Sequence, residues 1–459
     1  MTHVLEHSGD PERSLECSLA LRRSLSVLCL SALPLLAQEP QPGLEFGFQE
    51  RVRSEAWDNL VDHRTATPDF KTQYRFRTRV WAVVPLNADL TFTAGLVNEN
   101  RKVSRPDVAF NGREVIFETL YLDWRVDPSW SLRAGRQTLM RGDGFVLMDG
   151  GALDGSRTGY VNALDLTWKG GEAKVEFLAI SDPHKDQYLP RLNETDNLKE
   201  RQLLNERDEA ALALYGTWRH EGHDVQAYAF HKTERHDSRA LTDPLFVPDR
   251  RVETLGGRLA EDLGKGLSAT GEFALQSGRQ AGRPGTNEAT STIRAWGGQA
   301  RLTQSFKTAY EPSATLGWVG LSGDDPATSA KEGWDPLFSR WPQWSELYVY
   351  SQVPEGGVAT WSNLHLWEAT VQVKPHAKVG LRASLFWLRA YEPVTGKGSL
   401  FAPGLGRGRL AELRADFTFS EQWQGHVLYE RLDPGTFYSG VDAGRFFRVE
   451  AIYTLRRRR

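Results

Sequence analysis

Polar and apolar residues alternate along almost the whole of this chain, and this alternation limits the folds open to it more than any other feature. Alternation is typical of a strand whose two faces meet different surroundings, because successive side chains point to opposite sides. About eighteen such segments follow one another, and we expect no helix between them. They are Leu44–Arg53, Thr72–Val84, Ala88–Glu99, Glu114–Val126, Trp130–Met140, Tyr160–Lys169, Ala173–Asp182, Glu209–Arg219, His223–Thr233, Val252–Asp262, Leu267–Ser277, Thr292–Ser305, Pro312–Ser322, Trp361–Val373, Val379–Tyr391, Arg409–Phe419, Trp423–Leu432 and Arg445–Leu455.

The links between these segments alternate in length. Short links follow even-numbered segments, at Pro85–Asn87, Asp127–Ser129, Gly170–Gly171, His220–Gly222, Leu263–Gly264, Lys374–Lys378 and Ser420–Gln422. Long polar links follow odd-numbered segments, as at Ser54–Lys71, Pro183–Asp208 and Gly323–Thr360. A membrane barrel produces this pattern, because its strands leave the periplasm into long external loops and return to short turns. The sequence therefore predicts an all-β fold, a transmembrane antiparallel β-barrel of about 18 strands and of the outer-membrane type.

The composition agrees with this prediction and excludes other classes. Mean hydropathy is -0.47, and after residue 37 no run of about 18 apolar residues suggests a membrane-spanning helix. Barrel strands look hydrophilic on average, because only every second residue meets lipid. The 15 Trp and 13 Tyr are residues that favour the membrane–water boundary. A net charge of -3 argues against a nucleic-acid partner.

The N-terminal segment resembles a secretory signal. Arg22 and Arg23 precede the apolar run Leu25–Leu36, and Ala37 precedes Gln38. We expect residues 1–37 to be a signal peptide and residues 38–459 to form the barrel. Start codon and cleavage site stay open, because the polar start is long and Leu35 fits the small-residue rule poorly. Both cysteines lie in residues 1–37, so the mature chain would have neither a disulfide nor a thiol nucleophile.

Alternation places a set of arginines on the inner strand faces. A charge facing lipid at the bilayer midplane costs about 2–4 kcal/mol, so charged faces should line a watery lumen. The candidate pore-lining or substrate-binding residues are Arg53, Arg75, Arg77, Arg79, Arg133, Arg136, Arg382, Arg414 and Arg448, and Arg51 shares their side. Arg136 is the exception to simple alternation, which turns it toward lipid unless Gly135 hosts a bulge that re-aims it.

These arginines have two interpretations. Guanidinium groups stay ionised and bind carboxylates in a two-pronged manner, so a ladder of them could guide an anion through the lumen. Acidic residues on the same faces, including Glu272, Glu368, Glu412, Asp416 and Glu450, could instead pair with them structurally. We find no catalytic set, no metal site and no need for a cofactor. His220 and His223 flank a predicted tight turn, where solvent exposure is more plausible than metal binding.

Several short motifs, in order along the chain, resemble the alginate-export family of outer-membrane barrels. They are Tyr74-Arg75-Phe76-Arg77-Thr78-Arg79, Ala134-Gly135-Arg136-Gln137, Arg141-Gly142-Asp143-Gly144, Ser322-Gly323-Asp324-Asp325-Pro326, Asp335-Pro336-Leu337-Phe338 and Leu432-Asp433-Pro434-Gly435-Thr436-Phe437. The resemblance implies an eighteen-stranded barrel whose electropositive pore exports an anionic polysaccharide, with Arg75, Arg77 and Arg136 at the pore. The chain departs from the usual aromatic last residue of such barrels, since Arg456–Arg459 follow Leu455.

The expected function is a passive, non-enzymatic channel in a Gram-negative outer membrane that conducts an anionic solute, with export of a uronate-type polysaccharide as one form. Its partners would be that polysaccharide or a small anion, outer-membrane lipid and periplasmic export proteins. The main alternative is a general or small-anion-selective porin. A barrel enzyme acting on lipid or polysaccharide and a secreted carbohydrate-binding β-protein are further alternatives, and the latter would dissolve without detergent.

Overall fold

A computed structural model describes residues 43–109, 115–148, 160–184, 186–189, 192, 207–235, 240–243, 245–339, 344–357, 361–394 and 398–458. Its strands are β1 Glu45–Asp58, β2 Lys71–Pro85, β3 Leu90–Arg105, β4 Val115–Arg125, β5 Trp130–Gln137, β6 Val161–Gly170, β7 Ala173–Asp182, β8 Asp208–His220, β9 His223–Arg235, β10 Arg250–Gly264, β11 Leu267–Gln280, β12 Ser291–Ser305, β13 Ser313–Leu321, β14 Leu364–His376, β15 Val379–Arg389, β16 Gly406–Thr418, β17 Trp423–Pro434 and β18 Gly444–Arg458. Each predicted strand overlaps one of these. The signal-peptide prediction, by contrast, concerns residues outside the described part of the chain.

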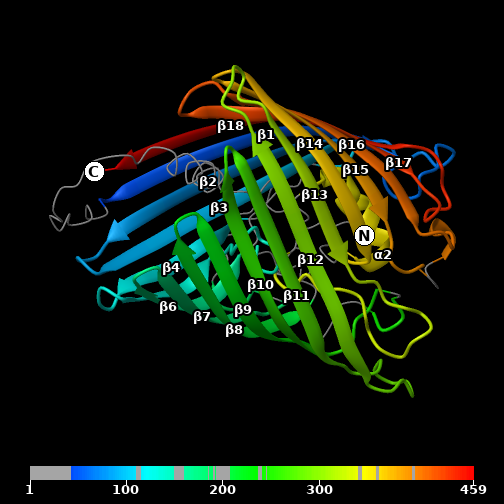
Figure 1. Cartoon of the computed structure of the whole chain (residues 1–459), viewed down its shortest axis with the longest axis horizontal. Coiled ribbons are helices and arrows are strands. Elements are labelled where there is room, and N and C mark those ends of the chain that lie inside the picture. The colour runs from blue at the N-terminus through cyan, green and yellow to red at the C-terminus, as the bar shows by residue number, and fades with distance from the viewer. Residues whose placement is uncertain are drawn as a thin grey trace.

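The strands form one closed 18-stranded sheet (Figure 1). Each strand pairs antiparallel with its sequence neighbours, and β1 closes the ring by pairing with β18 from Glu45–Arg458 to Asp58–Arg445. Closure removes both sheet edges, because every strand has a hydrogen-bonded neighbour on each side. Barrels of roughly 16 to 18 strands are wide enough to enclose an aqueous channel. The predicted barrel and its strand number are confirmed.

Connections at the two ends of the barrel differ in length, as predicted. The connections at one end cover 86–89, 126–129, 171–172, 221–222, 265–266, 306–312, 377–378 and 419–422, whereas those at the other end include 59–70, 138–160, 183–207, 322–363 and 390–405. Short turns lie on the periplasmic side of such barrels and long loops on the external side. The second end is therefore the external end.

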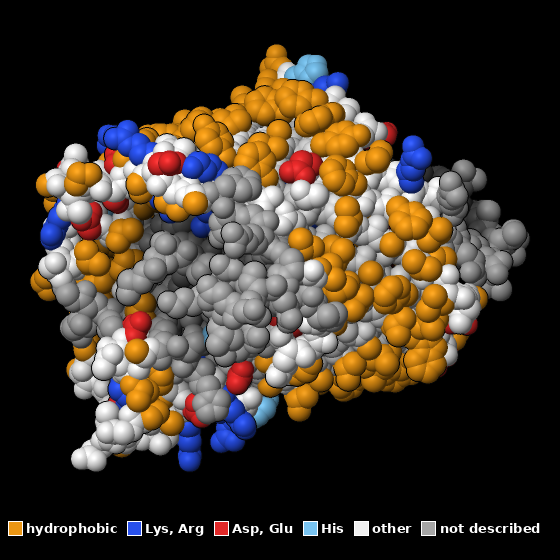
Figure 2. Space-filling view, turned by 180° about the vertical axis from the view of Figure 1, so that it is seen from behind, with side chains coloured by type: hydrophobic (Ala, Val, Ile, Leu, Met, Phe, Trp, Pro, Cys, Tyr) orange, Lys and Arg blue, Asp and Glu red, His pale blue; other side chains and the backbone are white. Residues whose placement is uncertain are grey.

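The two faces of the wall differ as the alternation requires. In β2, Arg75 and Arg77 are buried on the inner face, whereas Tyr74 and Val80 on the outer face are more than 40% exposed. Figure 2 shows hydrophobic side chains spread over the outer wall, with charged side chains gathered mainly toward the ends. Within the described residues, no helix is long and apolar enough to cross a membrane.

One helix contradicts the expectation that no helix interrupts the strands. Helix α2, Glu346–Gly356, lies in the connection between β13 and β14, and a short 3-10 turn covers Gly398–Leu400. The Ser345 hydroxyl accepts a hydrogen bond from the Tyr348 amide and so caps the helix start. The side chains of Leu347, Tyr348 and Ser351 are buried, so α2 is packed inside the molecule.

Candidate functional site: the arginine face of the lumen

Strands β1 and β2 place four arginines directly opposite one another on the inner wall. In the antiparallel register, Arg51 lies opposite Arg77 and Arg53 opposite Arg75. Side chains in such positions have Cβ atoms about 5 Å apart, and like charges there destabilise the sheet. All four side chains are nearly fully buried. The wall therefore needs negative groups, from the protein or from solution, to hold this arrangement.

Glu55 and Glu450 supply most of that negative charge. Arg53 Nε donates to Glu450 Oε2 at 2.7 Å, and Arg448 Nε donates to Glu55 Oε1 at 2.8 Å. Arg75 Nη1 also donates to Glu55, at 3.3 Å. These contacts cross the β18–β1 and β1–β2 pairings, so the cluster ties together the strands at which the barrel closes.

Arg77 differs from its neighbours. Its Nη2 donates to the Gln49 side-chain oxygen at 2.7 Å. Its Nε and Nη1 find no hydrogen-bond partner, and no carboxylate of the described residues lies within ion-pair distance. Arg79, one step toward the periplasm, is paired with Glu118 at 2.6 Å. Arg77 is thus a buried cation on the inner face whose charge the neighbouring strands leave without a carboxylate partner.

Three other predicted arginines lie nearer the periplasmic end and are paired. Arg133 donates to both oxygens of Asp123, at 2.6 and 3.1 Å, and its guanidinium lies over the Tyr121 ring. Arg382 pairs with Glu412 at 2.7 Å, and Arg414 pairs with Asp416 at 2.8 Å. These side chains are partly exposed. Most of the predicted arginines are therefore paired with a carboxylate, which is what the second interpretation of these arginines, structural pairing, requires.

Arg136 is neither exposed to lipid nor re-aimed by an inserted residue. Pairing with both neighbouring strands continues unbroken through Gly135, which itself has φ +130°. The Arg136 guanidinium donates to both carboxylate oxygens of Asp186 at 2.7 Å and lies 4.1 Å from the centre of the Tyr160 ring. Asp186 belongs to the loop after β7, so contacts from an external loop bury this arginine.

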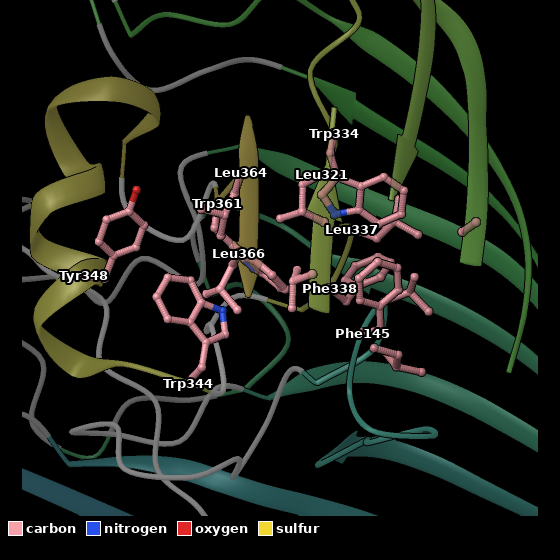
Figure 3. Close-up of a cluster of buried hydrophobic side chains, with 14 of the residues drawn as sticks. Phe145, Leu321, Trp334, Leu337, Phe338, Trp344, Tyr348, Trp361, Leu364 and Leu366 are labelled. Atoms are coloured by element: carbon pink, nitrogen blue, oxygen red, sulfur yellow. The ribbon is translucent and has the colours of Figure 1, made fainter. Parts of the chain in front are cut away.

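Two segments from the connections on the external side pack together on the inner side of the wall, which the sequence did not predict. Phe145 stacks on Trp334 with ring centres 5.1 Å apart (Figure 3), and Leu147 pairs with Phe338 in a short parallel bridge. Lys232 of β9 donates to the Leu337 carbonyl at 2.9 Å. A buried apolar cluster thus occupies part of the barrel interior.

Helix α2 is fixed to the wall by charged groups of three strands. Glu430 of β17 accepts hydrogen bonds from the Glu346 and Leu347 amides, at 3.1 and 2.6 Å, so a carboxylate lies at the positive end of the helix. Arg448 of β18 pairs with Glu346 at 2.9 Å. Arg407 of β16 holds Glu355 in the last turn. The inner wall of β16–β18 therefore joins the arginine face to α2.

The interior therefore contains a fixed, mostly compensated charge array and a packed apolar cluster. Such an array can attract and orient an ion through its field, because nearby low-dielectric walls strengthen that field. Of the described residues, no three His, Cys, Asp or Glu side chains lie together as metal ligands would. His220 is paired with Glu172 and His223 with Glu261, at the periplasmic turns.

Comparison with known proteins agrees with the architecture. The alginate export family matches residues 44–444. The solved structure of OpdQ from Pseudomonas aeruginosa superposes with a TM-score of 0.57 at 9% identity, covering 90% of this chain and 99% of that one. OprD from the same organism gives 0.55 at 9% identity, covering 92% and 96%, and OccK2 in complex with glucuronate gives 0.54 at 10% identity, covering 91% and 98%. No curated protein matches the chain. The protein thus has the fold of porin-like barrels and belongs in the bacterial outer membrane.

Proposed function

Because this chain belongs to the alginate export family, we propose that it is a passive channel that conducts an anionic solute along its arginine face. A uronate-type polysaccharide leaving the cell is the candidate cargo. The channel would work by charge selection, without bond chemistry and without a cofactor. Its central residue is Arg77, with Arg51 opposite it and Arg79 next along the same face of β2.

The unpaired charge of Arg77 carries this proposal. The other arginines of β1, β2 and β18 that face the lumen have carboxylate partners and would attract an anion weakly. Two nitrogens of Arg77 are buried without a hydrogen-bond partner among the described residues, and Arg51 across the pairing adds a second positive field. An anion that passes this face would be attracted by the field of these two guanidinium groups, and low-dielectric walls strengthen that field.

Two solved structures of the same fold support the proposal that the solute is an organic acid. OccK2 was solved with glucuronate, a single uronate unit, and OpdK was solved with vanillate, another carboxylate. The low identity of these proteins to our chain means that they share its fold alone. The proposal for this chain therefore depends on its own arginines.

Small-anion conduction is the second candidate, and the inward segments favour it. Phe145, Trp334 and α2 fill part of the interior, which narrows the space left for a polymer. Blocking single channels with alginate oligomers and with monomeric uronate separates the two. Block by oligomers that strengthens with chain length supports a polysaccharide path, whereas equal block by both supports a small-anion porin.

Ion selectivity tests the shared part of the proposal. In a planar bilayer under a salt gradient, the reversal potential of the wild-type channel should indicate a preference for anions over cations. Arg77→Gln should move that potential toward cation preference, since glutamine can still hydrogen-bond to Gln49. The control is Arg431→Gln, which removes an exposed arginine of β17 beside Asp433 on the outer face. An unchanged reversal potential for Arg77→Gln would overturn the proposal.

A further inference from the structure

The outer face of β9–β12 changes character close to its external end. In β10, Val252 and Thr254 are buried on the inner side, so Arg251, Glu253 and Leu255 point outward. The same alternation puts further polar residues on the outside at the external ends of the neighbouring strands. These are His231 and Thr233 of β9, Ser277 and Arg279 of β11, and Thr292 and Arg294 of β12. The four strands lie side by side in Figure 1.

Three arginines come together in this outer region, which we call the basic patch: Arg251, Arg279 and Arg294. Arg251 lies directly opposite Arg279, and Arg294 lies opposite Ser277, which is the diagonal position to Arg279. The Cβ atoms of directly opposite residues are about 5 Å apart and those of diagonal ones about 7–8 Å apart. All three guanidinium groups are therefore within reach of one phosphorylated headgroup.

No carboxylate among the described residues neutralises the basic patch. Its three arginine side chains are exposed and make no ion pair or side-chain hydrogen bond there. The one acidic residue on this outer face nearby, Glu253, is hydrogen-bonded to His231 at 2.7 Å. Like charges placed directly opposite destabilise a sheet unless an anion lies between them. Among the described residues, the patch thus lacks a compensating negative charge and can attract an anion from outside.

An apolar surface begins one step further from the external end. Leu255 and Leu275 are 68% and 57% exposed, and Phe273 stacks on Trp296 with ring centres 6.1 Å apart. Two outward residues that follow one another on the same face of a strand are about 7 Å apart. This distance is similar to that between the headgroup of a lipid and the first carbons of its acyl chains. A cationic band above an aromatic and aliphatic surface matches a lipid that carries phosphate on its headgroup.

We propose that the basic patch binds a phosphorylated glycolipid of the external leaflet, of the lipid A class. The long connections 236–249 and 281–290 join these strands next to the patch, which places it at the external end and not at the periplasmic one. Guanidinium groups bind phosphate oxygens through two parallel hydrogen bonds, and the acyl chains lie along Leu255, Leu275 and Phe273. This site is on the membrane side of the wall and does not depend on the cargo in the lumen.

The test compares lipid A binding to the purified barrel in detergent, by native mass spectrometry and by the shift in unfolding temperature. Wild type should retain lipid A, and the triple variant Arg251→Gln, Arg279→Gln, Arg294→Gln should bind it at least about tenfold more weakly. The control triple Arg125→Gln, Arg219→Gln, Lys374→Gln removes the same charge at the periplasmic rim and should bind as wild type. Arg279→Gln alone is the second variant, and heat-modifiable migration on gels verifies that each barrel is folded.

Three results would overturn the proposal. Equal lipid A affinity of the folded triple variant and of wild type would exclude the patch. Equal binding of dephosphorylated lipid A would show that only acyl chains are recognised. Displacement of lipid A by inorganic phosphate alone, at concentrations similar to those of lipid A, would show a free-anion site.

Discussion

Arg407 and Glu355 form a two-pronged ion pair that joins strand β16 to the last turn of α2, with 2.7 Å between Nη1 and Oε2 and 2.6 Å between Nη2 and Oε1. Arg407 is fully buried and lies 4.0 Å from the centre of the Phe437 ring, whereas Glu355 is slightly exposed. The helix inside the barrel is thus fixed by charge at its C-terminal end as well as at its start.

Removing only the cation of this pair should be costly. Arg407→Met removes the guanidinium from the largely buried Glu355 carboxylate, and we expect the free energy of unfolding to fall by about 3 kcal/mol. The double variant Arg407→Met, Glu355→Gln should lose less than the single variant, because no lone charge remains. Urea unfolding in detergent gives these values and that of Glu355→Gln alone. A double variant that loses the sum of the two single losses would show that the two residues do not interact.

Glu430 should stabilise the first turn of α2 by accepting hydrogen bonds from two of its amides. Glu430→Gln keeps an acceptor oxygen for one of the Glu346 and Leu347 amides and turns an NH2 group toward the other. We expect a loss of about 1–2 kcal/mol in the local stability of the helix, measured as faster hydrogen exchange of α2 amides. Glu421→Gln, in the exposed turn 419–422, is the control. Unchanged exchange in α2 would contradict the assigned role.

His63 makes the external loop 59–70 sensitive to acid. Burial lowers the pKa of His63 to about 4 from 6.5 and outweighs the opposing effect of the nearby Asp62 carboxylate. The unfolded loop binds a proton more readily than the folded one, so stability is complete above pH 6.5 and falls as the pH drops toward 4. The loss should reach roughly 3 kcal/mol at pH 4.

Hydrogen exchange of the loop between pH 7 and pH 4, corrected for the intrinsic rate, measures this loss. In wild type the protection of the loop should decrease toward pH 4. In His63→Phe, whose ring can still pack edge-on against Tyr438, protection should change little with pH. The same decrease in both proteins would rule out His63 as its source.

Two glycines provide a matched pair for the packing of the inner wall. A Cβ added at Gly47 of β1 would lie 1.9 Å from the Trp81 ring, whereas one added at Gly380 of β15 would meet nothing within 4 Å. Gly47→Ala should therefore destabilise the barrel by about 1–3 kcal/mol, while Gly380→Ala should be neutral or stabilising. Thermal unfolding followed by circular dichroism compares them. Equal stability of the two variants would mean that Trp81 moves aside without cost.

The strands could be predicted from the sequence because alternation and turn lengths are local signals. Tyr74 and Arg75 point to opposite sides whatever lies beside them, so the inner and outer faces of β2 follow directly. The pairing of Arg53 with Glu450, which are 397 positions apart, depends on the register between the first and last strands. That register is set by closure of the barrel, and the sequence of either strand alone does not contain it.

Helix α2 could not be predicted for a related reason. Its sequence contains Val349, Val353 and Pro354, which are poor helix formers, and it lacks a clear helical period. The helix is stabilised by Ser345, by the Glu430 carboxylate 84 positions away and by burial within the barrel. Arg136 shows the same limit, since the residue that binds it, Asp186, belongs to a distant loop.

The most direct test of the account is chemical modification of Arg77→Cys in a single open channel. Both natural cysteines, Cys17 and Cys29, lie in the segment predicted as a signal peptide, so the mature protein would carry one thiol. A negatively charged methanethiosulfonate should reduce the anion current in a step, and a positively charged one should restore anion preference. Leu413→Cys on the outer face is the control. Modification of the Arg77→Cys thiol, verified by mass, without any change in current would contradict the claim that anions pass along this face.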